Sequence, residues 1–253
     1  MDIEFTVIFW NIWEAVQCGR IDDGTFLKQR LEQLIDEYDP DYFGLNEVLV
    51  DKQTGSSPVL DFFKSKGYYT HFTEFSPIHE TWMIGSTLIS KQKPSTVVEH
   101  PLGPDSQAQR QRNHHGFHVK AIEGRFKTND QEITIWVNYL QSLLPSDWLP
   151  HIRQRRTFET LLAELDAKNL IVGGDFNETK YMLPWLRLPK RFKRLTGTFI
   201  NPTWRLEAKR RYLVQSNYDN IIYSTDGSLR LESFKVLPRS PSDHSPLIAT
   251  FKV

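Results

Sequence analysis

The chain has 253 residues, 39% of them hydrophobic and 13% aromatic, which suffices for a substantial core, and we expect a single domain over residues 1–253. Lys plus Arg and Asp plus Glu each number 31, so the formal net charge of zero excludes a globally basic nucleic-acid-binding protein and confines any nucleic-acid surface to a local patch. A lone cysteine, Cys18, excludes an intramolecular disulfide.

The N-terminus and the hydropathy pattern indicate where in the cell we expect the protein. Residues 1–5 lack the basic and long apolar regions of a signal peptide, and no apolar run approaches membrane-spanning length. We therefore expect a cytoplasmic monomer without a membrane partner.

The first part of the chain predicts strands and helices in alternation. The apolar residues 3–11 predict a central strand that ends at Asn11. Residues 25–38 carry apolar side chains at helical spacing and predict an amphipathic helix. A short buried strand over 42–45 follows, with Glu47 just past its end. Further along we expect a short helix over 57–66, strands over 68–75 and 81–90, and a long polar loop over 91–112.

The second part begins with a predicted hairpin. Strands over 115–126 and 133–140 are joined by a turn at 127–130. Residues 148–168 have helical spacing and predict a third helix. Later strands are expected over 218–223, 230–237 and 247–253.

Histidines at the start of this hairpin resemble a metal cluster. His114 and His115 are adjacent, so on a strand their side chains would face opposite sides. No Cys or third ligand lies at zinc-site spacing from them and His118. We therefore do not expect zinc at this position.

The most informative stretch is residues 169–177. Residues 169–172 run into Gly173 and Gly174, which predicts a buried strand ending in a tight turn. Asp175 and Asn177 follow at i and i+2 and share a face if the strand geometry persists. A carboxylate can bind a metal or take a proton, and an amide can orient a phosphate or a water. The alternative is an Asx turn that closes the strand.

A basic segment spans residues 187–211. It contains nine Lys and Arg residues and a single acid, Glu207, with aromatic side chains between them. Cations interleaved with aromatic platforms suit a phosphate backbone and stacked bases, so the segment favours nucleic acid. A solvated basic loop is the alternative.

Five short motifs then occur in a characteristic order, and the ordered set resembles the endonuclease/exonuclease/phosphatase superfamily. The motifs are Trp10-Asn11-Ile12, Leu45-Asn46-Glu47-Val48, Gly173-Gly174-Asp175-Phe176-Asn177, Asp219-Asn220-Ile221-Ile222 and Ser242-Asp243-His244-Ser245-Pro246. The resemblance implies an α+β fold, a four-layer α/β/β/α sandwich of two mostly antiparallel sheets with outer helices.

The resemblance also implies a metal site. Glu47 is similar to the main ligand of a divalent cation, normally Mg²⁺, with Mn²⁺ as an alternative. Asn11 is its neighbour in the site, and Asp243 adds a second carboxylate. Oxygen ligands suit such a hard cation.

Further site residues follow from the same motifs. Asp175 is similar to the residue that activates the attacking water, and Asn177 to the one that orients phosphate or water. His244 resembles the histidine that contacts the scissile phosphate, and Asp219 the acid that holds its ring in place.

One position departs from many members of the superfamily. Where a histidine is common, the chain has Tyr139, as in the exonuclease III branch, in which a tyrosine approaches the phosphate. An aromatic core residue is the alternative for Tyr139. Asn46 stands where a glutamine is usual, and both offer an amide. We also expect four residues to contact substrate: Trp204, Arg205, Arg112 and His115.

These observations predict a metal-dependent phosphodiesterase, specifically a nuclease or DNA-end-processing enzyme with DNA preferred over RNA. One alternative is a phosphatase or a phospholipid or inositol phosphodiesterase of the same superfamily. The other is a non-catalytic nucleic-acid-binding module.

Overall fold

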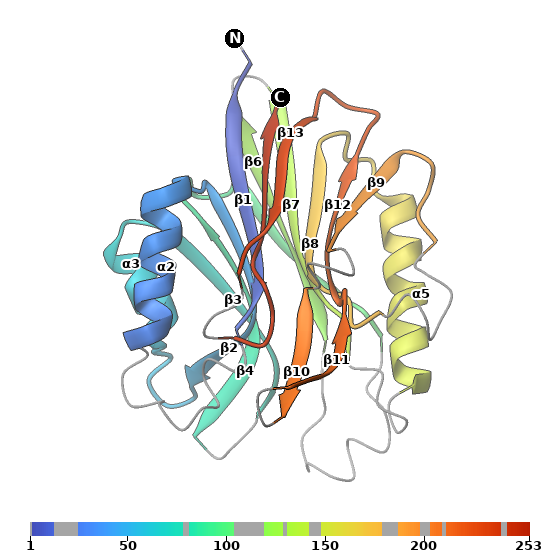
Figure 1. The fold of residues 1–253 in the computed structure, drawn as a ribbon. Coiled ribbons are helices and arrows are strands. Elements are labelled where there is room, and N and C mark those ends of the chain that lie inside the picture. The colour runs from blue at the N-terminus through green and yellow to red at the C-terminus, as the bar shows by residue number, and fades with distance from the viewer. Residues whose placement is uncertain are drawn as a thin grey trace.

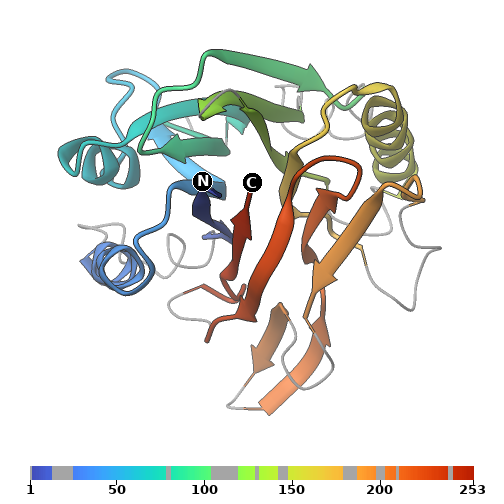
Figure 2. The same ribbon diagram turned by 90° about the horizontal axis from the view of Figure 1, so that it is seen from above.

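The computed structural model of the protein describes residues 2–12, 25–77, 81–103, 119–128, 131–141, 148–178, 187–197, 203–208, 211–238 and 242–253. Within these residues, two six-stranded β-sheets pack face to face, with helices on the outer side of each sheet (Figures 1 and 2). A small two-stranded sheet lies beside one end of this sandwich (Figure 1). The expected α/β/β/α layering is confirmed.

The first large sheet has the strand order β13-β14-β1-β2-β4-β3, and the second has the order β5-β6-β7-β8-β12-β9. The strands of the first sheet are β1 (Glu4–Asn11), β2 (Tyr42–Asp51), β3 (Tyr69–Pro77), β4 (Trp82–Ser90), β13 (Arg230–Val236) and β14 (Leu247–Lys252). Those of the second are β5 (Thr96–Pro101), β6 (Lys120–Thr128), β7 (Gln131–Tyr139), β8 (Leu170–Asp175), β9 (Phe192–Thr196) and β12 (Asp219–Ser224). The small sheet pairs β10 (Trp204–Ala208) with β11 (Arg211–Ser216), and the helices are α2 (Thr25–Tyr38), α3 (Pro58–Ser65) and α5 (Trp148–Glu164).

Each large sheet contains one parallel pair at its centre. The pair β1 and β2 is connected through α2, and the pair β7 and β8 through α5. Parallel strands end at the same edge, so Asn11 lies in register with Asn46, and Tyr139 with Asp175. The two pairs therefore bring motif residues to one end of the sandwich, the lower end in Figure 1.

The two sheets approach each other closely around Phe9. A Cβ at Gly44 would lie 2.4 Å from the Phe9 ring, and a Cβ at Gly173 would lie 2.2 Å from it. The glycines on both sheets therefore make room for one buried aromatic ring.

The outer layers rest on two further cores. Leu31 and Leu34 of α2 pack on the first sheet, and Phe158 and Leu162 of α5 pack on the second. No helix in the described ranges combines the length and the apolar character that crossing a bilayer requires.

Most predicted elements are confirmed with small shifts in their bounds. The helix predicted over 25–38 is α2, and the one predicted over 57–66 is α3. The hairpin is formed by β6 and β7, but Lys127 and Thr128, expected in its turn, belong to β6. Residues 115–118, expected at the start of the first hairpin strand, lie outside the described residues. The strands predicted over 3–11, 68–75, 81–90, 133–140, 218–223, 230–237 and 247–253 are β1, β3, β4, β7, β12, β13 and β14.

The prediction of one loop over 91–112 is wrong, because β5 lies within it. Thr96, Val97 and Val98 are β-branched and favour a strand. Because β5 is an edge strand, Pro101 at its end breaks no interior ladder. Residues 104–112 lie outside the described part of the chain.

The two strands that carry the central motifs are longer than predicted. β2 continues to Asp51, so Glu47 lies inside a strand and not past its end. β8 continues through Gly173 and Gly174 to Asp175, so these glycines form no tight turn. Hydrogen-bond ladders with β7 and β12 on both sides of β8 outweigh the local turn tendency of glycine.

The end of the third helix also differs, since α5 stops at Glu164 and not at residue 168. The Arg191 guanidinium donates hydrogen bonds to the carbonyl oxygens of Leu162 and Leu165 and satisfies groups that a helix C-terminus leaves open. The sequence predicts no strand in or next to the basic segment, but the structure has three there, β9 to β11.

Candidate active site

Glu47 lies in a β-bulge in the middle of β2. The pairing of β2 with β4 shifts between Leu45 and Val48, so two residues of β2 face one residue of β4. Glu47 has a φ of 62°, a left-handed conformation that costs a non-glycine residue on the order of 1 kcal/mol. Its carboxylate accepts a hydrogen bond from Asn11, with Nδ2 and Oε1 2.9 Å apart.

Asn11 joins carboxylates from the two sheets. Its Nδ2 atom donates to Glu47 and also to Oδ2 of Asp175, at 3.0 Å. Asn11 and Asp175 are each only 1% exposed. Because Asn11 ends β1 and Asp175 ends β8, this contact spans the space between the sheets at the site.

Asp175 and Asn177 form the Asx turn that the sequence left open. The backbone N–H of Asn177 donates to Oδ1 of Asp175 at 2.8 Å, and Asn177 has a φ of 48°. The Asn177 side chain donates to the carbonyl oxygen of Leu140 at 2.7 Å. The strand geometry therefore does not persist to Asn177, and the turn leaves Oδ2 of Asp175 facing Asn11.

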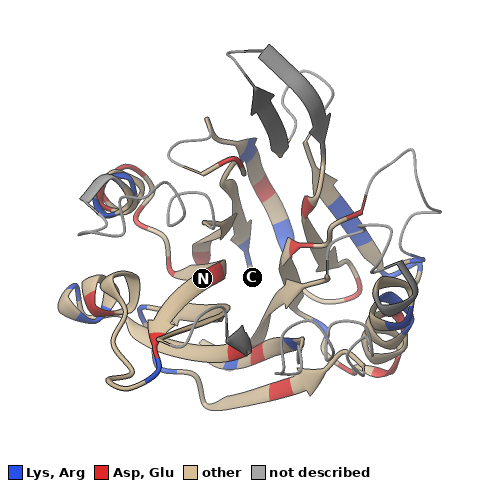
Figure 3. Cartoon of the chain, turned by 90° about the horizontal axis from the view of Figure 1, so that it is seen from below, with Lys and Arg blue, Asp and Glu red and all other residues tan. Residues whose placement is uncertain are grey.

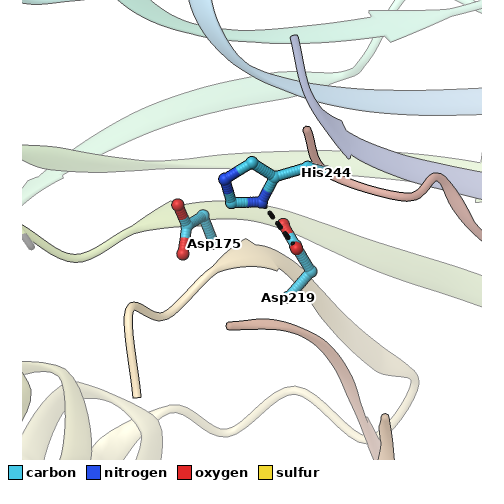
Figure 4. Close-up of side chains that lie close together, drawn as sticks. All are labelled: Asp175, Asp219 and His244. Atoms are coloured by element: carbon cyan, nitrogen blue, oxygen red, sulfur yellow. Dashed lines mark hydrogen bonds and ion pairs between the residues drawn. The ribbon is translucent and has the colours of Figure 1, made fainter. Parts of the chain in front are cut away.

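His244 and Asp219 form a buried pair opposite Asp175. Nδ1 of His244 lies 2.7 Å from Oδ2 of Asp219, and Figure 4 shows the ring between the two carboxylates. Asp219 begins β12, in register with Asp175 at the end of β8. The indole N–H of Trp10 donates to the carbonyl oxygen of His244 at 3.0 Å and fixes the histidine backbone.

Burial and charge shift the pKa values of these groups. Burial by itself lowers the pKa of His244, but the charge and hydrogen bond of Asp219, with the charges of Asp175 and Asp243, raise it to about 10. Burial raises the pKa of Asp175 to about 7, and the nearby Asp219 and Glu47 charges add to this effect against the His244 charge. Burial also raises the pKa of Glu47. At neutral pH the ring is therefore an imidazolium among carboxylates.

Two sets of groups at the site have metal-ligating chemistry. Ligand atoms of Asp175, Asp219 and His244 all lie within 4.8 Å of one another. Nδ1 of His244 is already held by Asp219, so that histidine nitrogen is engaged in an ion pair. Glu47 and Asp243 offer further carboxylate oxygens, and Oδ1 of Asp243 lies 3.9 Å from Nε2 of His244.

Tyr139 ends β7 in register with Asp175 and is 8% exposed. Its ring stacks on Phe75 of the other sheet, with centroids 4.6 Å apart. Its hydroxyl donates a hydrogen bond to Glu47, which lowers the pKa of that carboxyl against the effect of burial. Tyr139 thus lies at the site and contacts Glu47 and the core at once.

The expected substrate contacts are described only in part. Arg112 and His115 lie outside the described residues, as do His114 and His118. Trp204 and Arg205 begin β10, and only their backbone is described.

Two arginines of the basic segment have internal partners. Arg191 caps α5 and lies 3.3 Å from Oδ2 of Asp226. Arg194, largely buried on β9, lies 3.7 Å from Oε2 of Glu178. Figure 3 shows the basic residues of β9 beside α5, and Arg187, Lys190 and Lys193 are the exposed basic residues in the part of this segment whose side chains the structure describes.

Several residues to which the sequence analysis assigns no role in the site hold it together. Asn46 accepts a hydrogen bond from the Asp175 backbone N–H at 2.9 Å. Thr203 accepts one from the Asp219 backbone N–H at 3.0 Å. The Ser242 hydroxyl donates to the carbonyl oxygen of Asn11 at 2.7 Å. Their only signal in the sequence is their position inside or beside the motifs.

Comparison with protein families found a match that covers most of the chain. The model described as the endonuclease/exonuclease/phosphatase family matches residues 8–244. A search among curated proteins found no significant match.

Solved structures of low identity share the fold. An endonuclease/exonuclease/phosphatase from Beutenbergia cavernae DSM 12333 has a TM-score of 0.71 at 17% identity, over 99% of this chain and 72% of its own. TDP2 of D. rerio, solved with a single-strand DNA product, has a TM-score of 0.69 at 15% identity, over 99% of both chains. ANGEL2, a 2',3'-cyclic phosphatase, has a TM-score of 0.69 at 14% identity, over 99% of this chain and 95% of its own. At these identities the likeness establishes the fold alone.

Proposed function

Because the chain belongs to the endonuclease/exonuclease/phosphatase family, whose members are phosphoesterases, we propose that it is a divalent-cation-dependent phosphodiesterase acting on nucleic acid, with DNA preferred over RNA. One observation carries the proposal. Asn11 bridges Glu47 and Asp175 at the same end of the sandwich where Asp219 holds a protonated His244. The imidazolium suits the negative charge that phosphodiester hydrolysis develops, and the carboxylates suit a divalent cation and the proton of the attacking water.

The residues fit a hard divalent cation. Glu47 and Asp243 contribute carboxylate oxygens, which such cations prefer. Burial raises the pKa of Glu47, the hydrogen bonds from Asn11 and Tyr139 and the His244 charge oppose this, and the Asp243 charge adds a smaller increase. A bound cation would relieve the repulsion between the Glu47 and Asp243 carboxylates. Asn11 turns its amide nitrogen, and not its oxygen, towards Glu47, so ligation through Oδ1 would require the amide to turn over. We assign Glu47 and Asp243 as ligands and Asn11 as the neighbour that completes the site.

The cation, Mg²⁺ with Mn²⁺ as an alternative, would neutralise charge on the scissile phosphate. Asp175 takes the proton of the attacking water, which its raised pKa of about 7 suits. Asn177 holds Asp175 in its turn and orients the phosphate or water.

His244 acts on the phosphate from the other side. Its Nδ1–H is held by Asp219, so the Nε2–H remains directed at the site and donates to a phosphate oxygen. The Tyr139 hydroxyl, which contacts Glu47, lies close enough to orient that carboxylate. In this proposal Asp175 moves a proton, His244 binds the phosphate, and Tyr139 and Asn177 orient their neighbours.

A second candidate is a phosphatase of the same family. The observation that favours it is the use of Arg191 and Arg194 in internal contacts, which reduces the cationic surface that the basic segment offers to a long nucleic acid. A small or terminal phosphoester needs fewer surface cations than an extended strand.

The proposal is tested by incubating the purified protein with labelled single-stranded, duplex, abasic and 5'-adducted DNA, with RNA, and with a generic phosphomonoester. Parallel reactions contain Mg²⁺, Mn²⁺ or EDTA. Glu47→Gln and Asp175→Asn are compared with Asp61→Asn, which changes an exposed carboxylate on α3. We expect metal-dependent cleavage of nucleic acid that both site variants abolish and the control retains. Turnover of the phosphomonoester alone would support the phosphatase, and no metal-dependent turnover would contradict both candidates.

A further inference from the structure

The buried carboxamide of Asn46 connects both sheets directly behind the carboxylates. Its Oδ1 accepts from the Asp175 backbone N–H at 2.9 Å, and its Nδ2 donates to the Ser86 hydroxyl at 2.5 Å. Asn46 and Ser86 are both 0% exposed. One side chain of β2 is thereby bonded to β4 in its own sheet and to β8 in the other.

The contact with Ser86 lies at the β-bulge. Because the β2–β4 pairing shifts at this point, Asn46 and Glu47 together face Ser86. The side-chain bond replaces ladder contacts that the bulge omits, and it holds Glu47 in its left-handed conformation at φ 62°. The orientation of the Glu47 carboxylate therefore depends on the residue before it.

The contact with Asp175 requires a close approach at Gly174. This glycine has a φ of 136°, and a Cβ on it would lie 2.8 Å from Oδ1 of Asn46. Only glycine at position 174 leaves room for the Asn46 side-chain oxygen to reach the backbone N–H of Asp175. The second glycine of the motif and Asn46 are thus structurally coupled.

We propose that Asn46 is a positioning residue that sets the distance between Glu47 and Asp175. It acts on Glu47 through the bulge and on Asp175 through its backbone N–H, and it touches no reacting atom. The catalytic part of this inference rests on the proposed function. Both ends of the fully buried Asn46 amide are hydrogen-bonded, so its orientation is fixed. Displacing either carboxylate would therefore stretch or break one of these hydrogen bonds.

The test replaces Asn46 with an apolar residue of similar shape. Asn46→Leu removes both hydrogen bonds and keeps the number and branching of the side-chain heavy atoms. Its matched control is Asn169→Leu, at the opposite end of β8, where Asn169 is also buried and bonded to neighbouring segments. Both variants remove buried hydrogen bonds, and both should lower the melting temperature.

Two measurements separate positioning from packing. The first is hydrogen exchange at the Asp175 backbone amide, followed by NMR. We expect Asn46→Leu to accelerate this exchange selectively, and Asn169→Leu to leave it unchanged. The second is the separation of kcat from KM for phosphodiester hydrolysis. We expect kcat to fall about 100-fold in Asn46→Leu with KM nearly unchanged, and the control to keep both.

Ser86→Ala provides a second variant if Asn46→Leu fails to fold. It leaves the bond to Asp175 but removes the anchor of Nδ2, so we expect a smaller loss of kcat with partial loss of Asp175 amide protection.

Unchanged Asp175 exchange in folded Asn46→Leu, or unchanged kcat despite faster exchange, would overturn the proposal. If the wild-type protein hydrolyses no phosphoester, the proposed function fails, and the exchange result still decides whether Asn46 positions Asp175.

Discussion

Nδ1 of His244 lies 2.7 Å from Oδ2 of Asp219, although the two residues are 25 positions apart in the chain. Asp219 is held in turn by Thr203, whose hydroxyl accepts from the Asp219 backbone N–H. This buried pair determines which histidine nitrogen faces the rest of the site, and it maintains the imidazolium at neutral pH.

Asp219→Asn should remove that imidazolium. Without the charge and hydrogen bond of Asp219, only the Asp175 and Asp243 charges oppose burial, so the pKa of His244 falls from about 10. A raised histidine pKa keeps the ring charged below that value, so the variant needs a more acidic solution for the same charge. We expect turnover at neutral pH to fall about 100-fold or more. NMR titration of the ring checks this, with Asp226→Asn as the control, and a ring that still titrates near 10 would contradict it.

Asp175→Asn should stabilise the protein while abolishing its activity. The pKa of Asp175 is raised to about 7, so its charged form destabilises the fold above that pH. At about pH 8 in EDTA we expect the free energy of unfolding to rise by up to about 4 kcal/mol, less the cost of turning the Asn11 amide. The wild type gains stability as the pH falls through about 7, and the variant lacks this slope. Urea unfolding at several pH values measures both, and a destabilised variant at high pH would refute the account.

Glu123 should make the protein sensitive to acid. Its side chain is 0% exposed and accepts hydrogen bonds from His100 at 2.6 Å and Arg125 at 2.5 Å. Burial raises the pKa of Glu123, but these bonds outweigh burial and lower it overall. A lowered carboxyl pKa stabilises the fold above the ordinary value, and this contribution is lost as the pH falls through the folded-state value.

Glu123→Gln should therefore cost about 1–3 kcal/mol at neutral pH and much less in acid. Chemical unfolding at neutral and acidic pH measures the difference. Glu232→Gln, which removes an exposed partner of Lys252, is the matched control and should change stability by less than about 1 kcal/mol. Equal effects of the two substitutions at neutral pH would argue against a special role for the buried carboxylate.

Gly174→Ala should be more damaging than an equivalent change on the surface. The added Cβ would lie 2.0 Å from the carbonyl oxygen of Asn138, and the φ of 136° is rarely adopted by a residue with a side chain. Gly55 also has a positive φ, of 68°, but no atom lies within 4 Å of its added Cβ. We expect Gly55→Ala to cost about 1 kcal/mol and Gly174→Ala about 3 kcal/mol or more. Thermal unfolding ranks them, and similar melting temperatures would show that β8 can shift.

The secondary structure followed from local patterns where one face of an element is buried. The helix at 25–38 was predicted with the bounds of α2 because its apolar side chains recur at helical spacing against one sheet. β5 and β9 were missed because edge strands alternate weakly and carry charged side chains. The bounds of β2 and β8 were wrong because ladders with two neighbours extend strands through glycines and a bulge.

The site, too, has features that the sequence predicts and features that only the tertiary structure decides. The sequence by itself determined the residue types and their order, and through the resemblance of the motifs it identified the family that the model match over residues 8–244 supports. Only the tertiary structure decided that Asp175 closes an Asx turn, that Asn11 bridges two sheets, and that Asn46 reaches the Asp175 backbone. These contacts join residues up to 164 positions apart, across two sheets. No local pattern encodes such distances, because they depend on how closely the sheets approach around Phe9 and on a bulge that redirects two neighbouring side chains.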